Sequence, residues 1–345
     1  MAGGRGFGRG RTGVVPVAGA KRLAVVRRLR FFGVMTTTVF SHASCLNHVT
    51  PPGHPERVDR YEAVMRALAA DRFDALDRRA APMGEMADIL RCHPQSYIDL
   101  VEGAVPQAGS RALDPDTHLS AGSWEPVLRA VGGCSAAVDA VLAGAAGNAF
   151  VAMRPPGHHA ETARAMGFCL FGNVAIAAKR ALEVHGLKRV AVVDFDVHHG
   201  NGTQDLLWTE ERALFGSSHQ MPLWPGTGAV SETGAHGNIV NAPLDPWSGG
   251  AEMRRAYDDV ILPRVAEFEP ELILVSAGFD AHAADPLAQL NWTTEDFTWV
   301  TRRICEVADE VCGGRVVSTL EGGYDLDALA ACVAAHVDVL MEAAS

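Results

Sequence analysis

Short apolar runs alternate with longer segments that carry apolar residues at helical spacing. The apolar runs predict strands near residues 39–40, 149–153, 190–193, 213–219, 238–244, 271–276 and 315–320. The longer segments predict helices at about 56–68, 88–100 with a break at Pro94, 123–142, 174–184, 251–268, 294–311 and 326–341. Wholly apolar strands are typical of a parallel sheet covered on both faces. The alternation therefore predicts an α/β fold with one doubly wound, mainly parallel sheet flanked by helices.

Residues 1–34 differ from the rest of the chain. They are rich in Gly and Arg, lack periodicity, and contain eight Lys and Arg but no acidic residue. We interpret them as a disordered or non-native basic extension, with a targeting segment as the alternative, and place the folded domain at 35–345. The sequence has no run of 18 apolar residues, so no membrane-spanning segment is predicted.

The acidic charge balance after residue 34 indicates which kinds of substrate and partner the protein can bind. The chain carries a net charge of -11, and the residues after 34 hold 22 basic against 41 acidic side chains. An acidic surface favours cationic substrates and argues against nucleic-acid binding. Seven cysteines without a CxxC pair are typical of free thiols in a reducing compartment, so we expect a cytoplasmic protein.

The run 190–193 continues directly into a polar segment, Asp194-Phe195-Asp196-Val197-His198-His199-Gly200-Asn201-Gly202-Thr203. Side chains alternate along a strand, so Asp194, Asp196 and His198 point the same way. Ligands of open α/β sheets bind at the carboxyl ends of the strands, and Asp oxygens with a His nitrogen suit Zn²⁺. A solvated strand end is the alternative, but burying two acids without a cation is costly.

Three other predicted strands also end in polar residues: His158 and His159 follow the first, Asp285 the second and Tyr324 the third. Together with the opening segment they form the components of a metal hydrolase. Two carboxylates and one imidazole hold Zn²⁺ and leave positions for water and substrate. A neutral histidine then accepts the proton of the water, a second donates to the leaving amine, and a tyrosine donates to the oxyanion.

These motifs resemble the zinc-dependent histone deacetylase family, in particular its class II-like bacterial deacetylases and acetylpolyamine amidohydrolases. The resemblance spans about residues 38–340. It rests on six segments in this order: Arg-Pro-Pro-Gly-His-His at 154–159, Gly-Phe-Cys-Leu-Phe-Gly-Asn at 167–173, the segment 194–203, Ser-Ala-Gly-Phe-Asp at 276–280, Asp-Pro-Leu at 285–287 and Glu-Gly-Gly-Tyr at 321–324. It implies an arginase/deacetylase-like fold.

The resemblance also implies roles for individual residues. One zinc ion per chain is implied, with Asp196, His198 and Asp285 as ligands. His159 would be the general base and His158 its partner, Tyr324 the oxyanion donor, Asp194 the hydrogen-bond partner of His158, and Asn201 the support of His159. An uncharged partner is expected to leave His159 less basic. A structural potassium ion is implied at Asp194, Asp196, His198, Ser217 and Ser218.

Four residues are implied as the lining of a narrow substrate tunnel: Gly167, Phe168, Trp224 and Trp292. Trp224 replaces the more usual Phe, and Trp292 replaces a Leu. The polyamine-preferring branch has an acidic residue at the last of these positions, so Trp292 gives that mode of recognition no support. Bulky indoles at the mouth equally favour an aromatic or xenobiotic amide.

The expected function is zinc-dependent hydrolysis of acyl groups, most simply acetyl, from acetyl-lysine or similar acylated amines by metal-activated water. Acetylpolyamines or small xenobiotic amides are alternative substrates, and a homo-oligomer is a possible assembly. Two further hypotheses differ in chemistry. An arginase-like ureohydrolase would need a two-manganese site and would leave Tyr324 without a role. A silent acyl-ligand binding module typically loses a ligand or the tyrosine, and this sequence retains all of them.

Overall fold

The structure, a computed structural model, describes residues 1–4 and 35–344. Most of the basic segment predicted over residues 1–34 therefore lies outside the described residues. Residues 35–344 belong to one compact unit.

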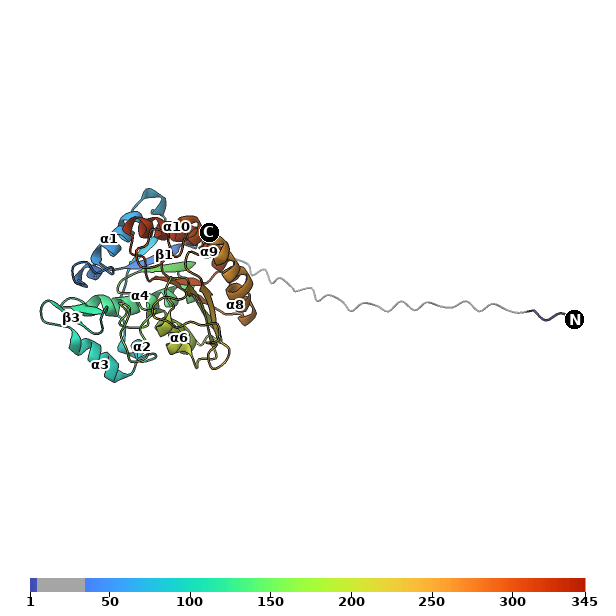
Figure 1. Ribbon diagram of the computed structural model, residues 1–345, viewed down its shortest axis with the longest axis horizontal. Coiled ribbons are helices and arrows are strands. Elements are labelled where there is room, and N and C mark those ends of the chain that lie inside the picture. The colour runs from blue at the N-terminus through green and yellow to red at the C-terminus, as the bar shows by residue number, and fades with distance from the viewer. Residues whose placement is uncertain (5–34, 345) are drawn as a thin grey trace. The chain divides into compact units, whose positions relative to one another are not determined.

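An eight-stranded sheet forms the centre of this unit (Figure 1). All of its neighbouring strands are parallel, in the order β2-β1-β5-β10-β9-β6-β7-β8. In chain order they are β1 (Thr37–Ser41), β2 (Asp77–Ala80), β5 (Asn148–Ala152), β6 (Val190–Asp194), β7 (Ala213–Gln220), β8 (Ile239–Leu244), β9 (Ile273–Ala277) and β10 (Val316–Leu320). A separate antiparallel hairpin consists of β3 (Ser110–Ala112) and β4 (His118–Ser120).

Helices cover both faces of the sheet (Figure 1). One layer contains α1 (Val58–Ala67), α7 (Gly250–Arg255), the π-helix η3 (Ala256–Ile261), α8 (Leu262–Phe268), α9 (Thr294–Cys312) and α10 (Leu326–Ala344). The other contains α2 (Met86–Ile89), α3 (Gln95–Ala104), α4 (Trp124–Leu142), α5 (Asn173–Glu183) and α6 (Asn201–Leu207). Two short 3₁₀ helices, η1 (Ala43–Asn47) and η2 (Asp71–Phe73), lie in the loops.

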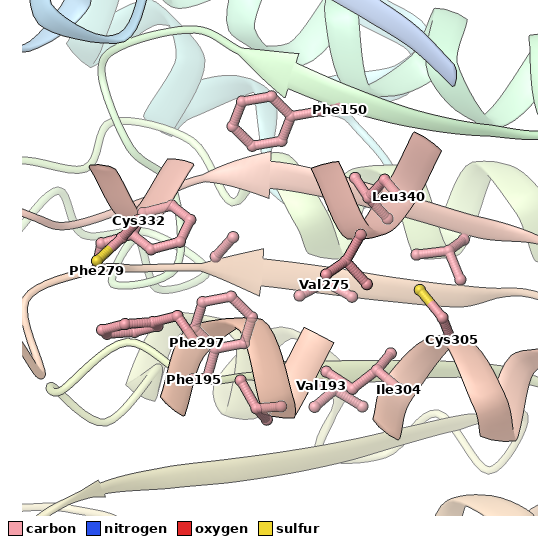
Figure 2. Packing of buried hydrophobic residues seen from close by; sticks show 14 of the residues in the cluster. Phe150, Val193, Phe195, Val275, Phe279, Phe297, Ile304, Cys305, Cys332 and Leu340 are labelled. Carbon is pink, nitrogen blue, oxygen red and sulfur yellow. The ribbon is translucent and has the colours of Figure 1, made fainter. Parts of the chain in front are cut away.

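The core divides into two clusters, one on each face of the sheet. Along β6, Val190 and Val192 belong to one cluster, and Ala191 and Val193 to the other. This is the alternation that a strand produces when both of its faces are buried. Figure 2 shows one cluster, in which Val193 of β6 lies beside Ile304 of α9.

The structure confirms the predicted doubly wound parallel sheet and corrects some element boundaries. The edge strand β2 was not predicted, because its sequence, Asp-Arg-Arg-Ala, lacks the apolar character of the central strands. The break predicted at Pro94 is confirmed: α2 and α3 are separate helices, and Pro94 directly precedes α3. Within the described part of the chain, no helix combines the length and apolar character that crossing a membrane requires.

Candidate active site

The topology brings the four predicted strand ends together. β5, β10, β9 and β6 are consecutive neighbours in the sheet and run parallel, so their carboxyl ends share one edge. The segments that follow them carry His158 and His159, Tyr324, Asp285, and Asp196 with His198. Residues more than 160 positions apart in the sequence therefore meet at this edge.

Three buried side chains at this edge form a group that could hold a metal ion: Asp196, His198 and Asp280. Each offers one ligand atom, and these atoms lie within 4.8 Å of one another. Nδ1 of His198 is 3.2 Å from Oδ1 of Asp196 and 3.2 Å from Oδ2 of Asp280. Burial and the nearby Asp196 raise the pKa of Asp280, as expected for like charges placed together out of water. Two buried carboxylates and an imidazole fit a divalent cation such as zinc.

Glycines allow the backbone to approach this group. A Cβ atom at Gly278 would lie 2.0 Å from Oδ2 of Asp196, and one at Gly322 would lie 2.2 Å from Oδ2 of Asp280. The amide of Gly322 donates to Oδ2 of Asp196 at 2.8 Å. Only glycine fits at these two positions, so the loop after β10 closes directly over the carboxylates.

Asp285, the third ligand expected from the sequence, lies beside this group but outside it. Its Oδ2 accepts hydrogen bonds from the amides of Tyr324 at 2.7 Å and Asp325 at 3.3 Å, and its Oδ1 accepts from Leu287 at 3.0 Å. Burial and the neighbouring Asp280 raise the pKa of Asp285 to about 7. Its role as a metal ligand therefore stays a prediction, and Asp280 is a second candidate.

Isosteric replacements distinguish the two carboxylates. We expect Asp285→Asn to lose most of its bound zinc and Asp280→Asn to retain it. The family resemblance makes Asp285 the third ligand, whereas Asp280 already has partners in the Val197 amide and the His198 ring. Zinc content, measured by atomic emission after exhaustive dialysis, is the readout, and circular dichroism controls for folding. The reverse pattern would assign the zinc to Asp280 and contradict the prediction for Asp285.

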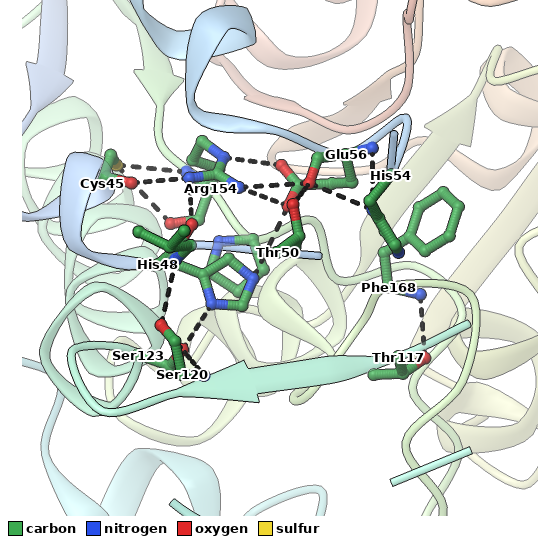
Figure 3. A network of polar contacts seen from close by, with 12 residues as sticks. Cys45, His48, Thr50, His54, Glu56, Thr117, Ser120, Ser123, Arg154 and Phe168 are labelled. Carbon is green, nitrogen blue, oxygen red and sulfur yellow. Dashed lines mark hydrogen bonds and ion pairs between the residues drawn. The ribbon is translucent and has the colours of Figure 1, made fainter. Parts of the chain in front are cut away.

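The tandem histidines lie on a turn that is fixed from both sides. Oε2 of Glu321, at the end of β10, accepts from the amides of Gly157 at 2.7 Å and His158 at 3.2 Å. Before the turn, Arg154 is fully buried and forms an ion pair with Glu56, with both guanidinium–carboxylate distances at 2.6 Å (Figure 3). The Arg154 guanidinium lowers the pKa of Glu56 to about 2, although burial alone would raise it. The backbone carrying both imidazoles is therefore held by buried charge-assisted hydrogen bonds.

The two imidazoles have different partners. Nδ1 of His158 is 3.0 Å from Oδ2 of Asp194, and Nδ1 of His159 is 2.8 Å from Oδ1 of Asn201. Burial alone would lower the pKa of His158, but Asp196 and Asp194 outweigh it and raise the pKa to about 10. Burial and the neighbouring His158 and His198 lower the pKa of His159 well below its usual value.

The pKa of His159 is lowered, as expected from the sequence, but for a different reason. Burial and the adjacent imidazoles lower its pKa, whereas the hydrogen bond to Asn201 raises it. The pKa values of the two adjacent imidazoles are therefore shifted in opposite directions. Such a divergence is typical of paired groups that act as base and acid.

Tyr324 follows the glycines of the loop after β10, and Arg60 of α1 holds this loop. The Arg60 guanidinium donates to the carbonyls of Gly323 at 2.6 Å and Glu321 at 2.5 Å, and it lies 4.9 Å from the centroid of the Tyr324 ring. The partly buried position of Tyr324 raises the pKa of its hydroxyl well above the usual value. The hydroxyl is therefore an O–H donor throughout the neutral range.

Three of the four predicted tunnel residues surround these groups. The ring of Phe168 lies 5.8 Å from that of Tyr324, and the half-exposed ring of Trp224 lies 4.7 Å from that of His159. Gly167 has a φ of +55°, and a Cβ there would lie 2.4 Å from the His159 ring. Only glycine fits in this conformation and space, so Gly167 lets the loop pass directly over the histidine.

Trp292 requires a correction, because it does not lie at a mouth. Its side chain is 0% exposed, and its ring packs 5.4 Å from that of Phe297 in the core. The backbone explains this placement, since the Trp292 amide donates to the Ala281 carbonyl and its carbonyl accepts from Ala283. The indole is thereby turned inward, beneath α9.

The residues predicted to hold potassium are also adjacent. Ser217 of β7 is the direct strand neighbour of Asp194. The Ser217 hydroxyl is 3.0 Å from Nδ1 of His219, and the Ser218 hydroxyl is 2.9 Å from that of Tyr257. Both hydroxyls thus have partners within the protein, and the potassium site stays a prediction.

A parallel sheet with a buried Asp/His group, two imidazoles and a tyrosine at its carboxyl edge is the arrangement expected of a hydrolase. Comparison with known proteins identifies the family. The model of the histone deacetylase domain matches residues 54–340. Histone deacetylase 14, chloroplastic, of Arabidopsis thaliana is 38% identical, with 86% of this chain and 74% of that protein covered. A histone deacetylase-like amidohydrolase of Pseudomonas aeruginosa is 39% identical, with 80% and 74% covered.

A solved structure agrees with these relatives. The crystal structure of the HDA15 HD domain superimposes with a TM-score of 0.85 at 32% identity, covering 90% of this chain and 89% of that one. The chain belongs to the histone deacetylase family. This membership favours the deacetylase hypothesis over the ureohydrolase hypothesis.

Three residues that hold the site had no role in the sequence prediction: Arg60, Glu161 and Glu321. Asp280 was expected at the carboxyl edge of the sheet but not as a ligand. Glu321 lay inside a recognised motif, and its position directly after an apolar strand was a signal. Arg60 lies on an amphipathic helix and reaches Glu321 across 261 residues of sequence, so no local pattern indicated it.

Proposed function

We propose that this protein is a zinc-dependent amide hydrolase that removes acetyl groups from N-acetylated amines, most simply acetyl-lysine. One observation supports the proposal above all. The group that could hold a metal ion, His159 with its lowered pKa, and the loop that carries Tyr324 lie together at one edge of the sheet. The names of the relatives, which include deacetylases and an amidohydrolase, support the same chemistry.

Asp196 and His198, with Asp285 or Asp280, would hold the zinc. A bound zinc ion lowers the pKa of water and polarises a carbonyl oxygen. His159 takes a proton from the attacking water, since its neutral ring can accept one. His158, protonated beside Asp194, donates a proton to the leaving amine as the C–N bond breaks. Tyr324 donates a hydrogen bond to the oxygen that becomes negative.

The features near the site support an extended acyl-amine substrate. Phe168 and Trp224 present aromatic rings beside Tyr324 and His159, which suits the aliphatic chain of acetyl-lysine. With Trp292 in the core, one of the two indoles that favoured an aromatic amide is not at the surface. Potassium at Asp194, Ser217 and Ser218, a cytoplasmic location and a homo-oligomer remain predictions.

A substrate panel tests the proposal. The zinc-loaded protein is expected to release acetate from an acetyl-lysine peptide faster than from acetylputrescine, acetylspermidine or a small aryl amide. Removal of zinc by chelation should abolish this activity, and added zinc should restore it. Activity that persists after chelation would contradict the metal assignment. Absence of hydrolysis across the panel would favour the hypothesis of a silent acyl-ligand binding module.

A further inference from the structure

The side-chain amide of Asn201 lies between His159 and Glu161. Its Oδ1 is 2.8 Å from Nδ1 of His159, and its Nδ2 donates to Oε1 of Glu161 at 2.8 Å. Nδ2 is also 3.4 Å from the sulfur of Met166. A carboxylate oxygen and a thioether sulfur accept hydrogen bonds but do not donate them. Only one orientation of the amide satisfies these neighbours, with its nitrogen toward Glu161 and its oxygen toward His159.

This orientation determines which nitrogen of His159 carries the proton. Oδ1 of Asn201 can only accept, so Nδ1 of His159 must donate. A neutral imidazole has one N–H, and Nε2 therefore holds the free electron pair. Among the residues at 35–344, none forms a hydrogen bond with this Nε2. With the amide reversed, its NH₂ group would face Nδ1 and the proton would move to Nε2, which then could not act as a base.

We propose that Glu161 is a positioning residue that fixes the orientation of the Asn201 amide and, through it, the tautomer of His159. The inference deepens the proposed function and depends on it for its kinetic consequence. It is specific to asparagine at position 201. The two oxygens of an aspartate there would be equivalent, so either could accept from His159 without help from Glu161.

The backbone around Glu161 is attached to the same helix as Asn201. Glu161 and Arg164 pair through their backbones, with N–O distances of 3.0 and 3.4 Å. The amide and hydroxyl of Thr162 donate to Oδ2 of Asp205, at 2.8 and 2.6 Å. Asn201 and Asp205 both belong to α6, so this turn and the amide are held by one rigid element. Glu161 is itself partly exposed, and water can replace part of its contact.

Kinetics of four variants test the inference. Glu161→Ala is expected to lower kcat about tenfold with KM nearly unchanged, as for other residues that orient a group in the site. Glu161→Gln keeps an acceptor oxygen and should restore most of kcat. In an Asn201→Asp background, Glu161→Ala should cause no further loss of kcat, since it can only relieve the repulsion between the two carboxylates. Glu211→Ala removes an exposed carboxylate shortly after α6 and serves as the control. A loss that persists in the Asn201→Asp background, or no loss in the single variant, would overturn the proposal.

The tautomer can be observed without any substrate. In ¹⁵N spectra of the histidine-labelled, zinc-loaded protein, the signals of His159 are those absent from the His159→Gln variant. We expect a proton on Nδ1 in the unmodified protein and in Glu161→Gln, and a mixture of tautomers in Glu161→Ala. Identical spectra for all three proteins would refute the role of Glu161. A protein inactive on every amide would refute the proposed function and leave this measurement decisive.

Discussion

Replacing His159 with alanine is expected to lower kcat by about 10²–10⁴-fold, the range typical of a lost general base. The physical reason is that His159 is the one of the two tandem imidazoles whose surroundings keep it neutral. His158 is a poor replacement, since Asp196 and Asp194 raise its pKa rather than lower it. Rates under saturating acetyl-lysine peptide measure the effect.

Two controls separate this chemical loss from a structural one. His159 packs against Trp224 and Gly167, so its removal leaves a space, and zinc content and thermal unfolding should be measured alongside the rate. Free imidazole in that space should restore part of the activity. His185→Ala removes a histidine on the surface beside Asp139 and should leave the rate unchanged. A His159→Ala protein that is folded, zinc-loaded and fully active would exclude His159 as the base.

Replacing Tyr324 with phenylalanine is expected to lower kcat by about 10²–10³-fold, because one donor to the developing oxyanion is lost. Zinc content should stay at the level of the unmodified protein. The backbone amide of Tyr324, which holds Asp285, is unaffected by the change. The ring also keeps its contacts with Phe168 and with the Arg60 guanidinium. The substitution therefore removes the hydroxyl and little else.

Tyr97 offers a matched comparison. Its side chain is buried, and its hydroxyl donates to the carbonyl of Leu170 at 2.6 Å rather than to any residue given a catalytic or metal role above. Tyr97→Phe should destabilise the fold by about 1 kcal/mol, the net worth of one hydrogen bond, and change kcat little. Equal losses of kcat in the two variants would remove Tyr324 from the chemical step.

The central fold and the general place of the site could be predicted from the sequence. Apolar runs such as 190–193 are buried on both faces, as the absence of polar residues in them indicates. Polar residues that follow such runs have to lie at the carboxyl edge, whichever order the strands take. The edge strand β2 could not be found in this way, since its sequence is mostly charged and its side chains alternate between partly buried and exposed.

The finer details of the site depended on contacts that no local pattern records. Trp292 was expected at a tunnel, but two backbone hydrogen bonds of its loop turn the indole into the core. Asp280 and Asp285 are five positions apart, and their sequence context did not show that Asp280 is the one beside His198. The support that Arg60 and Glu321 give to the site joins segments far apart in the sequence, so it exists only once the chain has folded.

The place of β10 between β5 and β9 has a consequence for how this protein is made. During synthesis, the tandem histidines and the predicted metal-binding segment leave the ribosome before β10 has been made. Until β10 inserts between them, β5 and β9 each lack one neighbouring strand, and Glu321 cannot hold the turn that carries the two histidines. The proposed hydrolytic site is therefore incomplete until β10 has been synthesised and has inserted into the sheet.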